Sequence, residues 1–500
     1  MASDVGFGKK LTRIFRSNTI ATSLYGFLYS AIVTIAPMFL IIGAVILMSN
    51  VLGYSKLSYA SRELYTETVL YQFIFSLLAA SPFNAVLSKY MSDLIYLERF
   101  EDMWPCFFVG MICQLLTACA LGIPFCLHEY FVGGVDILYV LVSFWGYIAL
   151  GLIFYNMVYL SILKDYKKIS LFYFLGMGSS FLLSLLFVRV FGWEVTFSML
   201  LALAAGYLIT ALLEFALLKR YFLTQSRVFW PVFKYMGQHW KLIFANFFYI
   251  LGLYTHNFVF WTTDINKTVV NTFVSADPYD MASFLALLTS ISTSIIFIVR
   301  VEMYFHERYR DYSEAVIGGR GRDIRKAQTR MFRQLSGELV ELVRIQFIIS
   351  VVVFLIFLVF LPQFGFSGLI MQIFPCLAAG YFIMFLMYAA IIFMYYFNDL
   401  TGALMTSLLF WLATFVCSIV ATQLPTIWYG LGLTLGALIG WVYVYFRLRW
   451  VERNLDVHIF CRGRLIATTK GRMPTAKVYD RYALARTAEQ KEYERGKRRK

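Results

Sequence analysis

The sequence predicts an all-α protein that crosses a membrane many times. Of its 500 residues, 60% are apolar and only 15% are charged, and the mean hydropathy is +0.69. Soluble domains carry about 25% charged residues, so this composition lies outside their range. The apolar residues also gather into runs long enough to cross a bilayer, while the charged residues lie between these runs.

Twelve apolar runs, each bounded by charged or turn residues, follow one another along the chain. A helix needs roughly 20 mostly apolar residues to cross the hydrocarbon core. All of the runs except the ninth approach or exceed this length. The predicted membrane spans are residues 24–52, 65–88, 104–127, 137–163, 169–191, 195–218, 242–263, 281–301, 345–361, 369–397, 400–424 and 427–446.

The distribution of Lys and Arg predicts the orientation of these spans. If the N-terminus is placed inside, the inner segments carry 40 of the 44 basic residues. Only Lys56, Arg62, Arg189 and Lys267 then lie toward the outside. Because basic loops stay in the cytoplasm, we expect both termini of this multi-pass protein to be cytoplasmic.

The twelve spans divide into two sets of six. Residues 1–218 and 242–446 hold one set each, and the linker 219–241 is predicted to be a helix along the inner surface. In each set the larger inner loop follows the second helix, at 89–103 and at 302–346. This correspondence predicts two pseudo-symmetric six-helix bundles, the usual architecture of secondary transporters, with substrate held between them.

Several other classes of protein are disfavoured by missing motifs. There is no Walker loop, and the His-Glu pairs at His128 and His306 lack the second histidine of a zinc protease. The largest soluble region is the 54-residue tail 447–500, too small for a glycosyltransferase. The seven cysteines show no disulfide framework, and the four from Cys106 to Cys126 fit helix packing better than metal binding. We therefore expect no enzyme activity, cofactor or metal.

Short motifs also occur in a characteristic order from the N-terminus to about residue 450. They are Val5-Gly6-Phe7, Ser81-Pro82, Lys89–Asp93, Tyr159–Tyr166, Asp277–Asp280, Arg300–Glu302 and Tyr395–Asp399. In order and spacing they resemble the PelG family of exopolysaccharide exporters. That family belongs to the multidrug/oligosaccharidyl-lipid/polysaccharide (MOP) flippase superfamily.

The resemblance implies a MOP flippase-like fold in the bacterial cytoplasmic membrane, with a central cavity that opens alternately to each side. It implies a polysaccharide cargo rich in N-acetylgalactosamine, exported for a biofilm matrix. It further implies a cytoplasmic glycosyltransferase and membrane regulatory subunits as partners. Two alternatives are a flippase for lipid-linked oligosaccharides and a scaffold subunit of a synthase complex that conducts nothing.

Polar residues inside membrane spans are candidates for the transport path, because burying them in hydrocarbon is costly. His256 and Asn257 could bind sugar hydroxyls in a cavity, or they could hold helices together through hydrogen bonds. Arg300 and Glu302, at the inner end of the eighth span, could form a gate or could anchor the helix end.

Five more polar residues form the rest of the candidate set. Glu214 could bind a coupling proton or cation, or could extend to the inner surface and pair with Lys219. Arg189 could line the cavity or pair with Glu194, and Asn84 beside Pro82 marks either a hinge or a fixed kink. Asn156 and Asn246 could contact sugar hydroxyls or bond neighbouring helices.

Two charged segments lie outside the spans. The loop 302–346 alternates charged and apolar residues, which predicts an amphipathic helix on the inner surface and a docking surface for the synthase. The tail 447–500 has 16 basic and six acidic residues, and we expect it to bind anionic lipids. Because the basic residues are confined to loops and to this tail, nucleic acid is not an expected partner.

Overall fold

The computed structural model describes residues 37–97, 99–162, 166–221, 226–300, 305–318, 320–364 and 368–455. The chain divides into two units, residues 1–445 and 446–500. Within the first unit, the helices up to Tyr221 are here called the first half, and those from Trp240 to Tyr445 the second half.

The first half consists of long helices that cover its second to sixth predicted spans, and a helix at Pro37–Val51 lies in the described part of the first. Pro82 lies inside α3, where its missing N–H leaves the carbonyl of Leu78 without the usual helical donor. The hydroxyl of Ser81 donates to that carbonyl at 2.9 Å, so the long helix continues through the proline. The elements are a helix at Pro37–Val51, η1 (Tyr54–Lys56), α3 (Tyr59–Tyr96), η2 (Phe100–Asp102), α4 (Met103–Phe131), α5 (Ile137–Ile162), α6 (Tyr166–Leu185), η3 (Leu186–Val190) and α7 (Val195–Tyr221).

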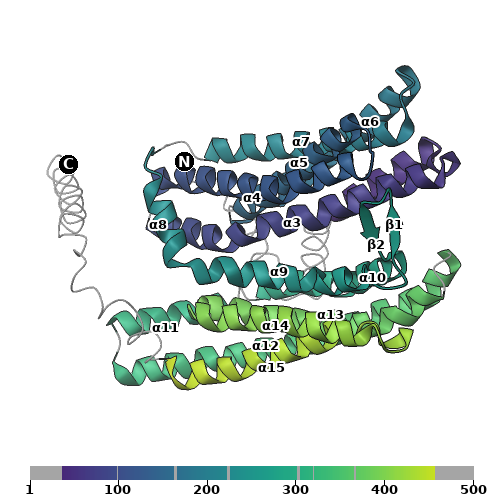
Figure 1. Cartoon of the computed structure of the whole chain (residues 1–500). Coiled ribbons are helices and arrows are strands. Elements are labelled where there is room, and N and C mark those ends of the chain that lie inside the picture. Colours follow the sequence, from purple (N-terminus) through teal and green to yellow (C-terminus); the bar gives the residue numbers. More distant parts are fainter. Residues whose placement is uncertain are drawn as a thin grey trace, which may run out of the picture. The chain divides into compact units, whose positions relative to one another are not determined.

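A short helix, α8 (Trp230–Gln238), lies in the predicted linker and packs against α3 and α4. The second half follows it (Figure 1). Its elements are α9 (Trp240–Phe260), β1 (Lys267–Val269), β2 (Phe273–Ser275), α10 (Asp277–Arg300), α11 (His306–Gly318), α12 (Gly321–Phe360), η5 (Leu361–Phe364), α13 (Leu369–Tyr396), α14 (Leu400–Ala421), η6 (Thr426–Trp428) and α15 (Leu431–Arg453), the last of which continues into the second unit.

The two strands form an antiparallel hairpin between α9 and α10. Lys267 pairs with Ser275 and Val269 pairs with Phe273. The turn holds Val270 and Asn271 at φ of 51° and 53°. Asn adopts this left-handed conformation readily, whereas a β-branched residue such as Val does so only under strain. The surrounding contacts therefore hold the hairpin turn in a specific shape.

The predicted loop 302–346 requires a correction. Of its described residues, most belong to α11 and to the N-terminal part of α12, a single 40-residue helix that continues into the ninth span. The helix persists because apolar residues recur on one face and are buried, with Phe332 stacked on Phe397 at 5.3 Å. The segment is thus an amphipathic extension of a membrane helix, and the apolar part of that helix begins after Arg344.

Corresponding helices of the two halves make similar contacts. The second and fourth helices of each half pack together, α3 on α5 and α10 on α13. In the first half Thr68 Oγ1 lies 3.2 Å from the Tyr139 hydroxyl, and in the second Ser283 Oγ lies 2.8 Å from the Tyr381 hydroxyl. The same type of hydroxyl pair at the same helix contact is what an internal repeat produces.

The last two helices of each half also pack alike, through glycines. A Cβ at Gly206 of α7 would overlap Ser180 of α6, and a Cβ at Gly432 of α15 would overlap Ser418 of α14. Small residues of this kind allow membrane helices to approach closely. Among the described residues, ten helices are long and apolar enough to cross a membrane, and Pro37–Val51 is a shorter apolar helix. The predicted all-α polytopic fold is confirmed, while the count of twelve spans stays a prediction.

Candidate transport site

The two halves meet along α3 of the first half and α9 of the second. Near the middle of this contact, Phe75 of α3 stacks on Phe258 of α9, with ring centroids 6.0 Å apart. Further along, the Asn246 side chain of α9 donates a hydrogen bond to the backbone carbonyl of Ser81. A substrate path between the halves must therefore pass beside α3.

The hairpin of the second half is bound to the first half by a group of polar contacts, here called the hairpin contact. The Ser275 hydroxyl donates to Glu67 Oε1 at 2.6 Å. The Tyr71 hydroxyl donates to the carbonyl of Val274 at 2.8 Å and accepts from its N–H at 2.9 Å. The contact consists of Glu63, Glu67 and Tyr71 of α3 with Lys267, Val274 and Ser275 of the hairpin.

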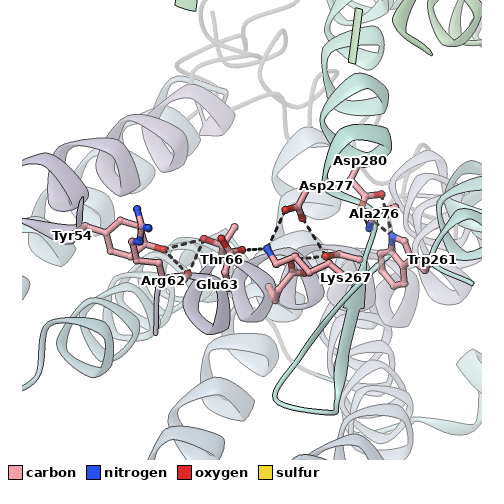
Figure 2. Close-up of polar contacts among 11 residues, drawn as sticks. Tyr54, Arg62, Glu63, Thr66, Trp261, Lys267, Ala276, Asp277 and Asp280 are labelled. Carbon is pink, nitrogen blue, oxygen red and sulfur yellow. Dashed lines mark hydrogen bonds and ion pairs between the residues drawn. The ribbon is translucent and has the colours of Figure 1, made fainter. Parts of the chain in front are cut away.

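Lys267 is the charged centre of the hairpin contact. Its Nζ forms ion pairs with Glu63 and, at 3.0 Å, with Asp277 Oδ2 (Figure 2). Burial lowers the pKa of Lys267, but the hydrogen bonds to Glu63 and Asp277 outweigh burial and raise it above 10.5. The side chain is only 19% exposed, so the ion pairs are partly shielded from water. Lys267 thus stays charged and joins the two halves at this end.

At the opposite end, where α8 lies, a different contact joins the halves. Lys89 Nζ of α3 donates to Asn398 Oδ1, just after α13, at 2.6 Å. This lysine is half-buried and so is less hydrated than a fully exposed one. Its partner Asn398 has a φ of 54°, a left-handed conformation that asparagine tolerates. Each end of the interface between the halves is therefore held by one lysine.

His256 and Asn257 both form hydrogen bonds between helices of the second half. His256 is fully buried, and its Nδ1 lies 2.9 Å from the Tyr279 hydroxyl of α10. Asn257 donates to Asp280 Oδ1 at 2.6 Å. These contacts favour the packing alternative for both residues, and a role in binding sugar stays a prediction.

Asp280 collects three donor groups in the first turn of α10. Besides Asn257, the Trp261 indole N–H lies 2.9 and 3.1 Å from its two carboxylate oxygens, and the N–H of Ala276 donates at 3.0 Å (Figure 2). The N-terminus of a helix also favours a negative charge. These donors and the helix N-terminus therefore offset part of the cost of burying this carboxylate.

Glu214 lies in contrasting surroundings in the first half. It is fully buried in α7, and neither carboxylate oxygen has a hydrogen-bond partner among the described residues. Asn156 of α5 approaches the same stretch of α7, since its Nδ2 donates to the carbonyl of Ala211 at 3.3 Å. The fold thus brings two predicted candidates, Glu214 and Asn156, to one helix contact. Because an ionised carboxylate is very costly to bury, and Asn156 is the donor that approaches it here, we expect Glu214 to be neutral in this conformation.

The remaining candidates lie elsewhere. Arg189 is exposed in η3 and its Nη2 is 3.5 Å from the carbonyl of Val51, while Glu194 accepts from Thr196 instead of pairing with it. Asn84 is half-buried in α3, two residues after Pro82. Arg300 is the last residue of α10, and the structure does not describe its side chain. Glu302 lies outside the described residues.

The first half also encloses a cavity of about 220 Å³ between α3, α4, α5 and the hairpin. Its wall is almost entirely apolar and aromatic. Of the few polar side chains there, Gln72 already donates to the Ser143 carbonyl at 2.9 Å. A sugar bound here would leave its hydroxyls without partners, which is unfavourable. The lining residues are Thr68, Tyr71, Gln72, Phe75, Leu121, Gly122, Phe125, Cys126, Ser143, Phe144, Tyr147 and Phe273.

Several residues of the site were not among the predicted candidates. Glu67 is the third residue of a predicted span, and Asp280 directly precedes another span within the motif Asp277–Asp280. Glu129, near the end of α4, is fully buried with both oxygens lacking a partner among the described residues. The signal that could have found them is an acidic residue within one turn of a span's end. No three His, Cys, Asp or Glu side chains of the described ranges come together as metal ligands would.

Comparison with known proteins agrees with this arrangement. Residues 1–460 match the family model described as "PelG: Putative exopolysaccharide Exporter (EPS-E)". Among curated proteins, none matches the sequence significantly.

Solved structures with the same fold are transporters. An outward-facing MATE family multidrug resistance transporter of the MOP superfamily aligns with a TM-score of 0.60 at 13% identity, over 86% of this chain and 96% of that one. A MATE structure in the bent conformation gives 0.59 at 12% identity, over 90% and 99%. A MOP superfamily transporter from Pyrococcus furiosus gives 0.57 at 15% identity, over 85% and 96%. At these identities the likeness establishes the fold alone.

Proposed function

The chain belongs to the PelG family, and from that premise we propose that it exports a Pel-type exopolysaccharide across the bacterial cytoplasmic membrane by alternating access. Its fold is that of the MOP transporters. The polymer is made by a cytoplasmic glycosyltransferase, and membrane regulatory subunits of the same system complete the complex. The basic tail binds anionic lipids on the cytoplasmic side.

The observation that carries this proposal is the pattern of contacts between the halves. They pack together mainly along α3 and α9, and lysine contacts join them at each end: Lys267 at the hairpin end and Lys89 at the α8 end. When one half rocks against the other, the contacts at one end break while those at the opposite end remain. Since basic segments place the α8 end inside, the hairpin contact closes the outer side.

Coupling to an ion gradient is assigned to Glu214. Its carboxylate is buried without donors in the conformation described here, so it is neutral or bound to a cation. When the halves move and water reaches α7, the carboxylate releases its proton or cation. Asn156, on the facing helix α5, lies close enough to α7 to respond when the charge of Glu214 changes.

A second candidate function is supported by the apolar cavity. Its aromatic wall suits a hydrocarbon chain better than a sugar, which favours a flippase whose substrate carries a lipid. In that case the lipid occupies the first half while the attached oligosaccharide passes between the halves.

Reconstitution in vesicles with the glycosyltransferase tests the proposal. We expect polymer synthesised outside the vesicles to reach the lumen, where added hydrolase cannot digest it. Polymer that is made but stays outside indicates the scaffold alternative. Transfer of a lipid-linked oligosaccharide in the absence of any polymerisation indicates the flippase.

A further inference from the structure

The N-terminal part of α12 carries a row of basic side chains on one face. Four of them follow one another at spacings of four, four and three residues, which places them along one line of the helix surface, and the fifth lies beside this line. All of them are exposed, and together with Gly321 and Thr329 they line one groove. This basic stripe consists of Arg322, Arg325, Lys326, Arg330 and Arg333.

None of the five has an ion-pair partner among the described residues. Other basic residues of α11 and α12 do have an ion-pair partner: Arg308 pairs with Asp311, and Arg344 pairs with Glu341. Asp311 of α11 and Asp323 of α12 line a neighbouring pocket together with Lys326 and Arg330, and among the described residues no ion pair joins them to these two. The stripe therefore keeps an excess of positive charge.

The position of the stripe opposes the stability of α12. Arg322 lies in the first turn of the helix and Arg325 follows in the second, where the helix dipole disfavours positive charge. Repulsion between basic side chains three and four residues apart adds to this cost. Asp323 in the same turn offsets only part of this cost, so the stripe is unfavourable for the helix unless a negatively charged partner covers it.

The stripe also lies too far from the bilayer to bind lipid headgroups. Arg344 is the last charged residue before the apolar part of α12, and Arg333 precedes it by 11 residues. At about 1.5 Å per residue, the stripe begins about 17 Å before Arg344 and ends about 33 Å before it. A headgroup layer is only about 5–8 Å deep, and even a 40° tilt leaves Arg333 about 13 Å away.

The rest of this chain cannot neutralise the stripe either. Residues 1–23 contain four basic residues and one acidic, and the tail 447–500 contains 16 basic and six acidic. Figure 1 places α11 and the start of α12 at the same end of the first unit as α8, the end predicted to face the cytoplasm. The occupant must come from another molecule in water.

We propose that the basic stripe of α12 docks an acidic helix of a water-soluble protein. A helix presenting Glu or Asp at spacings of three and four residues matches the line of charges over its whole length. Such pairs give specificity and a fast, salt-sensitive association. The proposal holds whatever cargo the protein carries, because it depends only on the charges, their spacing and their distance from the bilayer.

The test uses the full-length protein in nanodiscs and two synthetic helical peptides. One peptide carries its glutamates in a single row, and the other has the same composition with the glutamates spread around the helix. We expect the patterned peptide to bind at least tenfold more tightly, and to lose this advantage with R322E/R325E/R330E/R333E. The matched control reverses four exposed basic residues elsewhere, K219E/R220E/R227E/K234E. This control variant should still bind the patterned peptide more tightly than the other one.

Three outcomes would overturn the proposal. Equal binding of the two peptides means that the stripe recognises charge without pattern. Loss of peptide binding in nanodiscs containing anionic lipid, compared with zwitterionic ones, means that lipid occupies the stripe. Equally tight binding of a uridine oligonucleotide means that the site is a nucleic-acid site. Because reversal could disturb α12, the variant with lysine at all four arginine positions must also bind, within about threefold.

Discussion

Two carboxylates, the half-buried Asp280 of the second half and the fully buried Glu214 of the first, lie in opposite surroundings. In the second half, Asp280 receives hydrogen bonds from Asn257, Trp261 and the backbone of Ala276. In the first half, Glu214 is fully buried and receives none among the described residues, and Glu129 resembles it. The three residues lie on helices that do not correspond between the halves, since α10 is the second helix of its half while α4 and α7 are the third and sixth of theirs.

The difference separates a structural carboxylate from one that can change its charge. Fixed hydrogen-bond donors stabilise an ionised carboxylate between them. Removing the carboxylate leaves these donors unpaired. A carboxylate without donors is stable there only when neutral or bound to a cation, and it ionises when water enters. We therefore expect Asp280 to hold α9 and α10 together and Glu214 to respond to ion gradients.

The largest effect is expected for Asp280→Asn. The amide keeps one oxygen and replaces the other by an NH2 group, so either Asn257 or the N–H of Ala276 loses its acceptor, whichever way the amide is turned. Stability should fall by about 2–3 kcal/mol, measured by thermal unfolding of the detergent-solubilised protein. Glu214→Gln serves as the control and should unfold at an unchanged or higher temperature. If the two variants lost stability equally, the contrast between the two carboxylates would be wrong.

Glu214→Gln should instead impair transport. Glutamine resembles the neutral carboxylic acid but cannot release a proton, so export should drop tenfold or more while the amount of protein in the membrane stays normal. Secreted polymer and membrane levels are measured in the same cells. Asn156→Ala is measured in the same assays. Normal export by Glu214→Gln at every pH gradient would remove this residue from the coupling mechanism.

Charge reversal in the hairpin contact should have a smaller effect on export, and a second reversal should partly undo it. Lys267→Glu places three acidic side chains together and should hold the outer side open, which lowers export severalfold. Adding Glu63→Lys restores one opposite pair and should recover part of the activity. The readout is labelling of a cysteine introduced beside Phe258 by a thiol reagent that cannot cross the membrane. Failure of the double variant to recover would show that the ion pair does not close this side.

The smallest effect is expected for pH acting on the hairpin contact. The pKa of Lys267 is raised above its usual 10.5 by its acidic partners. Its charge is therefore fully present below pH 10.5 and is lost only as the pH rises through the higher value in the folded protein. The labelling of the same cysteine, taken relative to a fully exposed reference cysteine so that ionisation of the thiol cancels, should stay constant between about pH 8.5 and pH 10. Export that varies over this range would then have to be traced to a group other than Lys267, such as Glu214 or the buried Glu67.

The sequence by itself determined the class of the molecule and the course of its chain. Long apolar runs can be stable only as membrane helices, because hydrocarbon offers no partner for backbone polar groups. The boundaries of α5, α13 and α14 accordingly lie close to those predicted. The order of short motifs was enough to indicate the PelG family, which the family model over residues 1–460 confirms.

Only the tertiary structure decided which polar residues have partners. His256, Asn257 and Glu214 look equivalent in sequence, since each is a polar residue inside an apolar run. Their different surroundings arise from helices distant in sequence, such as Tyr279 and Asp280 on α10. A run of apolar residues specifies that a helix forms and is buried, but hydrogen bonds depend on the angle and register of the neighbouring helix. The pairing of Glu63 with Lys267, 204 positions apart, is a result of that packing.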